Sequence, residues 1–289
     1  MSIHEVLARV RDVHGLVFDE VHRAAEGQSG EGAWLAIDDD GRPVVVKWFP
    51  DETVAQRYEI LLRALAALRA LRYPAPSYGP ILVVPGATVA VQQRLPGRSG
   101  IPATAHVVDR VLAINELQVG VTDAPLLDHG SWGELIVHSL VVGENGYCVH
   151  ESLREWSPRS AALLERIEDV GASTTPSALP VTGVVHYDLH VGNLLVDDGS
   201  LVAVIDWEGA SLGDPRFDLV CFAQHLEGRG WSPLAVPAWA VLAATMAPEV
   251  LRAYVAHVVL RLVDWQIRHQ PSDVTNQLDT GERLLNRYV

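Results

Sequence analysis

Apolar residues in the first third of the chain occur mainly in short runs with the length of β-strands. Residues 33–37 and 43–49 are two such runs, and the turn-rich segment 38–41 between them predicts a β-hairpin. From about 52 to 72, apolar side chains recur at helical spacing, and Asp51 is placed to cap this helix. Two more strands are expected at 81–84 and 88–92.

The pattern changes after the segment 95–98, Leu-Pro-Gly-Arg, whose Pro-Gly pair predicts a break in structure. Beyond it, four segments have the spacing of amphipathic helices: 105–117, 153–170, 218–226 and 250–268. A chain of 289 residues is long for one small core. We therefore expect an α+β protein of two lobes, a β-rich lobe at 1–95 and a helical lobe at 96–289.

A short β segment between two of these helices carries the residues with the clearest chemistry. The apolar runs 194–196 and 201–205 flank an Asp-Asp-Gly-Ser turn and predict a hairpin. Asn193 precedes the first run and Asp206 follows the second, so antiparallel pairing brings both side chains to the same end. Their oxygens suit Mg²⁺ carrying a nucleoside triphosphate. Asp188, on the preceding loop, faces the same point, where it can accept a proton from an attacking hydroxyl.

Composition narrows the classes of partner. The formal net charge of −14 argues against a nucleic-acid partner and favours a cationic small molecule. No apolar run is long enough to predict a membrane span, and the N-terminal residues lack the layout of a signal peptide. We interpret Cys148 and Cys221 as buried thiols of a cytoplasmic protein. Whether it is a monomer or a homodimer stays open.

Lys47 is the single lysine among 22 lysine and arginine residues. It lies near the end of the second strand of the first predicted hairpin. A lysine ammonium is a compact point charge on a thin stem, whereas a guanidinium is a broad planar fork. A site that needs such a point charge against a phosphate would retain lysine in a chain otherwise biased toward arginine.

Three motifs in sequence order resemble those of one known family. They are HYDLHVGN at 186–193, IDWE at 205–208 and GDPRFDL at 213–219. Together they are similar to the HGDLHxGN, IDWE and GDPxxDL motifs of the aminoglycoside phosphotransferase and choline kinase family. The resemblance covers roughly residues 30–225 and implies a protein-kinase-like bilobal fold. Tyr187 departs from the glycine that is usual at its position.

The resemblance implies a role for several residues in binding ATP or GTP. Lys47 would hold the α- and β-phosphates, oriented by an acidic residue of the following helix, for which Glu59 fits the family pattern better than Glu52. Gln93 and Leu95 match the hinge whose backbone contacts the purine. The remaining implied residues are Gly30 in a phosphate-covering loop, and His186 and Asp218 as supports of the catalytic loop.

The acceptor is the least defined part of this interpretation. Acidic composition and carboxylates on predicted helices favour a polycationic acceptor, with Glu155, Asp264 and Glu208 as candidate contacts. An aminoglycoside and a tuberactinomycin peptide such as capreomycin or viomycin both fit, and the reaction would then confer resistance or self-resistance. A metabolic kinase for choline, homoserine or a sugar shares the same motifs and remains an alternative.

Two interpretations from other classes also stay open. His186, Asp188 and His190 could ligate a metal in a hydrolase, although such a site usually needs further clustered ligands. A kinase fold could instead bind a ligand without turnover, and Tyr187 keeps that alternative open. An assay of turnover with magnesium and nucleotide separates the three.

Overall fold

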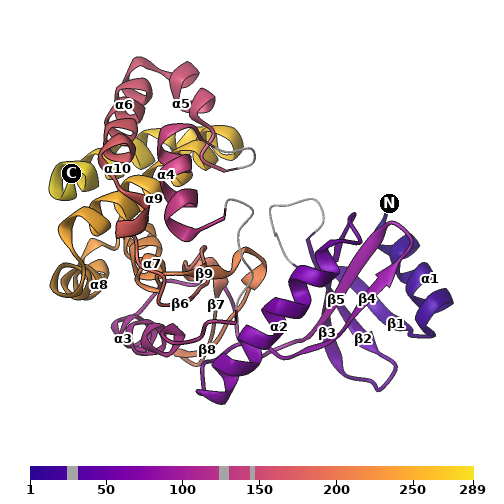
Figure 1. The fold of residues 1–289 in the computed structure, drawn as a ribbon. Coiled ribbons are helices and arrows are strands. Elements are labelled where there is room, and N and C mark those ends of the chain that lie inside the picture. Colours follow the sequence, from indigo (N-terminus) through magenta and orange to yellow (C-terminus); the bar gives the residue numbers. More distant parts are fainter. Residues whose placement is uncertain (25–31, 124–129, 144–146) are drawn as a thin grey trace.

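The computed structural model describes residues 1–24, 32–123, 130–143 and 147–289. Its first part is a five-stranded antiparallel sheet with the strand order β1-β2-β3-β5-β4 (Figure 1). The strands are β1 Phe18–Arg23, β2 Ala33–Asp38, β3 Pro43–Phe49, β4 Tyr78–Val84 and β5 Ala87–Gln93. Two helices belong to this part, α1 Ile3–His14 and α2 Val54–Ala70. All four strands expected between 33 and 92 are therefore present.

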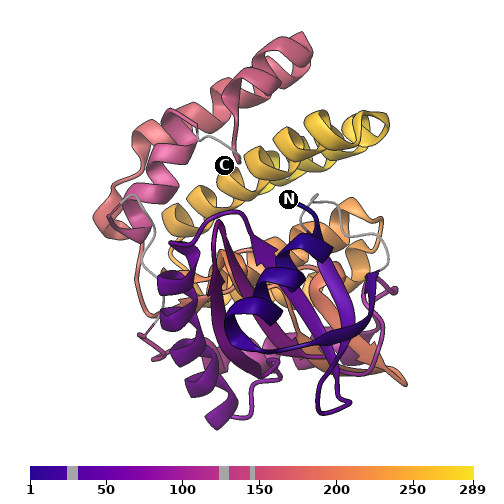
Figure 2. The same ribbon diagram turned by 90° about the vertical axis from the view of Figure 1, so that its right-hand side faces the viewer.

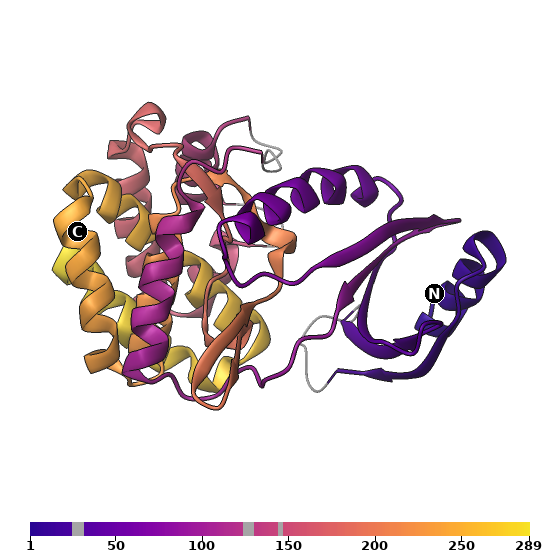
Figure 3. The same cartoon turned by 90° about the horizontal axis from the view of Figure 1, so that it is seen from below.

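Side-chain alternation along β3 divides the sheet between these two helices. Val44, Val46 and Trp48 are buried in one core cluster with apolar residues of α1. Successive residues of a strand point to opposite faces, so Lys47 points to the other face, where Phe49 packs with residues of α2. The period of β3 thus directs Lys47 to the face of the sheet on which α2 packs. Figure 3 shows that α2 lies between this sheet and the helical part of the chain.

No helix or strand was expected before residue 33, yet α1 has clear local causes. Ser2 and Glu5 form a reciprocal capping box at its start, and Gly15 ends it in a left-handed conformation. At α2, Asp51 accepts hydrogen bonds from the amide and the hydroxyl of Thr53, and the helix begins one residue later.

The second part of the chain is helical, with two short two-stranded antiparallel sheets, of which one is a hairpin. Its helices are α3 Ala105–Asn115, α4 Trp132–Val141, α5 His150–Trp156, α6 Pro158–Ser173, α7 Arg216–Gly228, α8 Ser232–Thr245, α9 Pro248–His269 and α10 Val274–Tyr288. The helix expected at 153–170 is two helices, because Ser157 caps α6 and Pro158 occupies its first turn. Strands β6 Gly183–Val185 and β9 Ser211–Gly213 pair, as do β7 Leu194–Asp197 and β8 Ser200–Val204.

Helix α9 is the centre of the second core. Tyr254, Val255 and Val259 have no exposed surface, and the helix packs against α4, α5, α6, α7 and α10. Figure 2 shows α9 and α10 lying behind the sheet of the first part. The fold is the expected one, a small β-rich lobe joined to a larger helical lobe.

The segment that joins the two lobes is attached to the β7–β8 hairpin. Arg98 pairs with Val196 as an antiparallel bridge, with N···O distances of 2.9 and 3.0 Å in the two directions. Gly97 has φ 100°, and a Cβ there would lie 3.0 Å from the Val196 carbonyl oxygen. Glycine is therefore required where the joining segment meets β7.

No helix within the described ranges combines the length and the apolar character needed to cross a lipid bilayer. Gly30, expected in a phosphate-covering loop, lies outside the described residues.

Candidate active site

The loop after β6 is held in place by a buried carboxylate at the start of α7. Asp218 is completely buried. It accepts hydrogen bonds from the amides of His186 (2.8 Å) and Tyr187 (2.9 Å) and from the side chain of Gln118 (2.7 Å). Burial raises the pKa of Asp218 although these donors and the neighbouring His186 oppose the rise. Asp218 thus shapes the loop from below and does not face the reacting centre.

Tyr187 adopts the backbone conformation that a glycine would adopt easily. Its φ is 76°, a left-handed conformation that costs an ordinary residue roughly 1–2 kcal/mol. The side chain is buried and stacks on Phe217, with ring centroids 5.4 Å apart and an interplanar angle of 14°. This packing offsets the cost of the left-handed backbone conformation. The loop therefore keeps, with a tyrosine, the conformation that a glycine would adopt easily.

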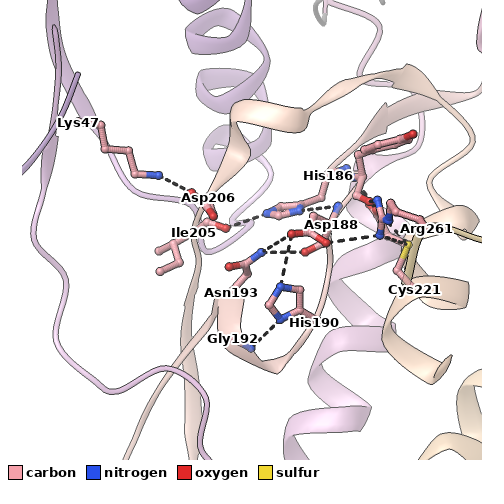
Figure 4. A network of polar contacts seen from close by, with 12 residues as sticks. Lys47, His186, Asp188, His190, Gly192, Asn193, Ile205, Asp206, Cys221 and Arg261 are labelled. Atoms are coloured by element: carbon pink, nitrogen blue, oxygen red, sulfur yellow. Dashed lines mark hydrogen bonds and ion pairs between the residues drawn. The ribbon is translucent and has the colours of Figure 1, made fainter. Parts of the chain in front are cut away.

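Asp188 follows on this loop, and its carboxylate lies among the side chains of Arg261, His190 and Asn193 (Figure 4). One carboxylate oxygen, Oδ1, lies 3.4 Å from Nη2 of Arg261. The other, Oδ2, lies 3.4 Å from Nε2 of His190 and 3.4 Å from Nδ2 of Asn193. Partial desolvation by the surrounding protein would raise the pKa of Asp188, but the His190 hydrogen bond and the Arg261 charge hold that pKa well below its usual value. The side chain remains 49% exposed, so an acceptor can reach it.

The two histidines of the loop use their ring nitrogens within the protein. Nδ1 of His186 accepts the Asp188 amide (3.3 Å), so its Nε2 carries the proton and donates to the Ile205 carbonyl (2.8 Å). Likewise, Nδ1 of His190 accepts the Gly192 amide (3.0 Å), so its Nε2 donates to Asp188. In the part of the chain that the structure describes, no group of three or more His, Cys, Asp and Glu residues is arranged to hold a metal. These contacts favour a positioning role for both histidines over zinc ligation.

The β7–β8 hairpin brings Asn193 and Asp206 to the same end. Leu194 pairs with Val204, and the Ile205 amide donates to the Asn193 carbonyl (2.9 Å). Nδ2 of Asn193 donates to the Asp188 carbonyl (2.8 Å), which leaves its Oδ1 as the oxygen that can face a cation. The Asp206 carboxylate is 52% exposed. An amide oxygen beside an accessible carboxylate is a donor set that fits Mg²⁺.

Asp206 and Glu208, rather than Glu59, bind Lys47. Nζ of Lys47 forms an ion pair with Asp206, and it lies 2.8 Å from Oε1 of Glu208. The hydroxyl of Tyr58, from α2, donates to the same Oε1 at 2.8 Å. Burial opposes the charge of Lys47, but the two carboxylates raise the pKa of Lys47 above its usual value. Glu59 is exposed, and the expectation that it pairs with Lys47 is not met, because α2 turns Tyr58 toward the site.

Glu52, the less favoured alternative to Glu59, and the two hinge residues have contacts of their own. Glu52 accepts the Gly86 amide at 2.7 Å and so caps the β4–β5 turn. In the hinge, the Gln93 side chain accepts the Ser77 hydroxyl (2.9 Å), and no hydrogen bond of the described residues reaches the Leu95 amide.

The three residues expected to contact the acceptor differ in their burial and in their partners. Asp264 is completely buried, and Arg268 binds both of its carboxylate oxygens at 2.7 Å. Its expected contact with an acceptor is wrong, because the α9 face that carries it packs into the core. Glu208 is turned toward Lys47, and Glu155 is exposed.

Two contributors were missed from the sequence, Tyr58 and Arg261. Arg261 is an arginine within an otherwise apolar stretch of the helix expected at 250–268, and such a position is a sign of a buried, paired charge. Tyr58 was counted only among the apolar positions of its helix, and nothing in its spacing indicates that its hydroxyl would meet Glu208.

Comparison with known proteins agrees with this geometry. The model of a family described as the phosphotransferase enzyme family matches residues 20–274. No curated protein sequence matched the chain. Among solved structures, a thermostable mutant of aminoglycoside phosphotransferase APH(4)-Ia, in a ternary complex with AMP-PNP and hygromycin B, is similar with a TM-score of 0.70. It is 18% identical in sequence, and the alignment covers 98% of each chain.

Two further solved structures have other acceptors in their names. Macrolide 2′-phosphotransferase MphH from Brachybacterium faecium has a TM-score of 0.58 and 18% identity, over 99% of this chain and 98% of that one. Choline kinase LicA from Streptococcus pneumoniae also has a TM-score of 0.58 and 18% identity, over 99% of each chain. The family match over most of the chain confirms the resemblance seen in the three motifs. This chain belongs to the phosphotransferase enzyme family and is a phosphotransferase that acts on a hydroxyl group.

Proposed function

We propose that this protein transfers the γ-phosphoryl group of ATP to a hydroxyl of a small cationic molecule, most specifically a basic antibiotic. The observation that carries the proposal is the convergence of four side chains from both lobes: Lys47, Asp188, Asn193 and Asp206. The same four types of group bind phosphate, metal and acceptor in kinases.

Each side chain has a distinct task in this proposal. Lys47 binds the α- and β-phosphates of the donor, while Asn193 and Asp206 hold Mg²⁺, which neutralises charge on the β- and γ-phosphates. Gln93 and Leu95 supply backbone groups to the purine, and the Leu95 amide is available for that contact. Asp188 accepts a hydrogen bond from the acceptor hydroxyl and so directs its oxygen toward the γ-phosphorus.

The transfer forms a bond between the acceptor oxygen and the γ-phosphorus and breaks the bond between that phosphorus and the β–γ bridging oxygen. ADP leaves, and the hydroxyl proton passes to Asp188 and then to solvent. Because the pKa of Asp188 is held low, its carboxylate is a weak base that orients the hydroxyl and receives the proton late. Late proton transfer suits a loose transition state, in which the nucleophile contributes little bonding.

A cationic acceptor is supported by the net charge of −14 and by the structural likeness to an enzyme solved with hygromycin B. Of the three candidate contacts, Glu155 is exposed, and its contact with an acceptor stays a prediction. An aminoglycoside and a tuberactinomycin peptide both carry the required positive charges. A metabolic kinase is the second candidate, favoured by the likeness to choline kinase LicA.

The decisive experiment incubates the protein with Mg²⁺ and either ATP or GTP against a panel of aminoglycosides, tuberactinomycins, a macrolide, choline and neutral sugars. A gain of one phosphate, read by mass spectrometry, identifies the acceptor and the donor. Phosphorylation of basic antibiotics supports the proposal, and turnover confined to choline or a sugar supports the metabolic alternative.

Variants of Asp188 test the chemistry within the same assay. Asp188→Asn removes the charge that orients the hydroxyl, and we expect turnover to fall by about 10²–10⁴. Affinity for Mg-nucleotide should stay close to that of the parent, since Asp188 is not assigned to the nucleotide. Near-parental turnover of this variant would remove Asp188 from its role.

A further inference from the structure

Arg261 connects the core of the helical lobe to the loop that carries Asp188. It lies on α9, 73 residues after Asp188, and its side chain is only 7% exposed. Nη1 donates to the Tyr187 carbonyl at 2.5 Å, and Nη2 lies 3.4 Å from both Oδ1 of Asp188 and Sγ of Cys221. The guanidinium therefore contacts the backbone carbonyl of Tyr187 and the carboxylate of the next residue, Asp188. Figure 4 shows its contacts with Asp188 and Cys221.

The carboxylate of Asp188 supplies the negative charge that compensates the buried positive charge of Arg261. Within the described ranges, Asp188 is the carboxylate with which Arg261 forms an ion pair. The neighbouring Cys221 and His257 are uncharged near neutral pH, because burial raises the pKa of Cys221 to about 12 and lowers the pKa of His257 to about 3. A buried cation without a counter-charge is strongly unfavourable. The folded core thus favours the conformation in which Asp188 reaches Arg261.

The side chain of Tyr187 packs against Arg261. The guanidinium carbon lies 5.0 Å from the centre of the Tyr187 ring, within the range of a cation–π contact. The Tyr187 hydroxyl lies 3.2 Å from Nε2 of His257, one turn before Arg261 on the same helix. A glycine at 187 could adopt the same backbone conformation, but it would remove the aromatic ring on which the guanidinium of Arg261 packs. The tyrosine that departs from the family pattern therefore helps to hold the buried arginine in place.

We propose that Arg261 is a positioning residue for the phosphoryl transfer, which holds Oδ1 of Asp188 while His190 holds Oδ2 and so sets the direction in which the carboxylate meets the acceptor hydroxyl. The inference rests on the proposed function and adds to it a contact from α9. Arg261 touches neither nucleotide nor acceptor, so its loss should lower kcat and leave the KM of the nucleotide nearly unchanged.

The test compares Arg261→Lys with Arg268→Lys, a matched change on the same helix at an arginine that binds the buried Asp264. A lysine keeps the charge but cannot contact the Tyr187 carbonyl and Asp188 with two separate nitrogens. We expect Arg261→Lys to lower kcat by about 10²-fold, the effect typical of a misplaced catalytic group. The nucleotide KM should change less than about twofold, and Arg268→Lys should keep the parental kcat.

Two further measurements separate positioning from a simple folding defect. Circular dichroism should first establish that the Arg261→Ala variant is folded. Added guanidinium should then restore part of the kcat of this variant and should leave the kcat of the parent unaffected. In the Asp188→Asn background, Arg261→Lys should cause little additional loss, because the two residues act as one unit.

An active parent whose Arg261→Lys variant keeps its kcat would overturn the role of Arg261 alone. The role would also be overturned if Arg261→Lys lowered kcat by the same factor in the parent and in the Asp188→Asn background. A parent that phosphorylates no acceptor in the panel would instead overturn the proposed function, and the role of Arg261 with it.

Discussion

The identity of the acidic partner of Lys47 gives a sharp prediction, because the chain offers two glutamates for comparison. Glu208 lies 2.8 Å from Nζ of Lys47, whereas Glu59 on α2 is exposed. Replacing each by glutamine removes one negative charge with almost no change in shape. If the geometry is right, Glu208→Gln impairs nucleotide use and Glu59→Gln does not.

The expected size follows from the burial of the ion pair. The Lys47 and Glu208 side chains are only 14% and 21% exposed, so their interaction is closer to a buried pair than to a surface one. Breaking a fully buried pair costs about 3–5 kcal/mol, but Lys47 keeps its contact with Asp206. We therefore expect a loss of about 2 kcal/mol, which is roughly 30-fold in kcat/KM for the nucleotide.

The assay is steady-state kinetics with varied Mg-nucleotide and a fixed, saturating acceptor. Tyr58→Phe removes one hydrogen bond to Glu208 and should cost about 1 kcal/mol, roughly fivefold. Glu59→Gln should stay within about twofold of the parent, as is usual for an exposed position. A larger defect in Glu59→Gln than in Glu208→Gln would refute the assignment and restore the pairing first expected from the sequence.

Three other predictions concern the metal, the lysine and the core. Lys47→Arg should impair turnover nearly as much as Lys47→Ala, because a wide fork replaces a point donor; an active arginine variant in the kinetic assay would contradict this. Asp206→Ala should abolish and Asn193→Ala should weaken Mg-dependent nucleotide binding, measured by calorimetry with and without Mg²⁺; parental binding in both would exclude the hairpin as the metal site. Burial, with the charge of Arg261, lowers the pKa of His257 from 6.5 to about 3, so the unfolded chain takes up a proton that the folded chain excludes. Folding stability should fall below pH 6.5 by up to about 1.4 kcal/mol per pH unit from this group, and urea titrations of His257→Gln should show a shallower fall; an unchanged slope would show that His257 does not contribute.

Local pattern was enough to predict the parts of the site that depend on one hairpin or one strand. Asn193 and Asp206 meet because a tight turn sets the register of two adjacent strands, and both sides of that register are visible in the sequence. Lys47 faces the helical lobe because side chains alternate along β3. The three motifs placed Asp188 on the loop that precedes Asn193, through resemblance to a family that the chain matches.

The partners of these residues were decided by how whole elements pack. The helical period of α2 was visible, but its rotation about its own axis was not, and that rotation turns Tyr58 inward and Glu59 outward. The same limit applies to α9, where packing against neighbouring helices buries Asp264 and brings Arg261 to Asp188.

The physical reason is the range of the forces involved. Hydrogen-bond periodicity and turn geometry act over a few residues, so a sequence determines a hairpin and the face of a strand almost by itself. The axial rotation and docking of a helix depend on the shapes of all the surfaces that it touches, which come from distant parts of the chain. Tertiary packing therefore chose Glu208 for Lys47 and Arg261 for Asp188, whereas the sequence alone determined where Lys47, Asp188, Asn193 and Asp206 stand on their elements.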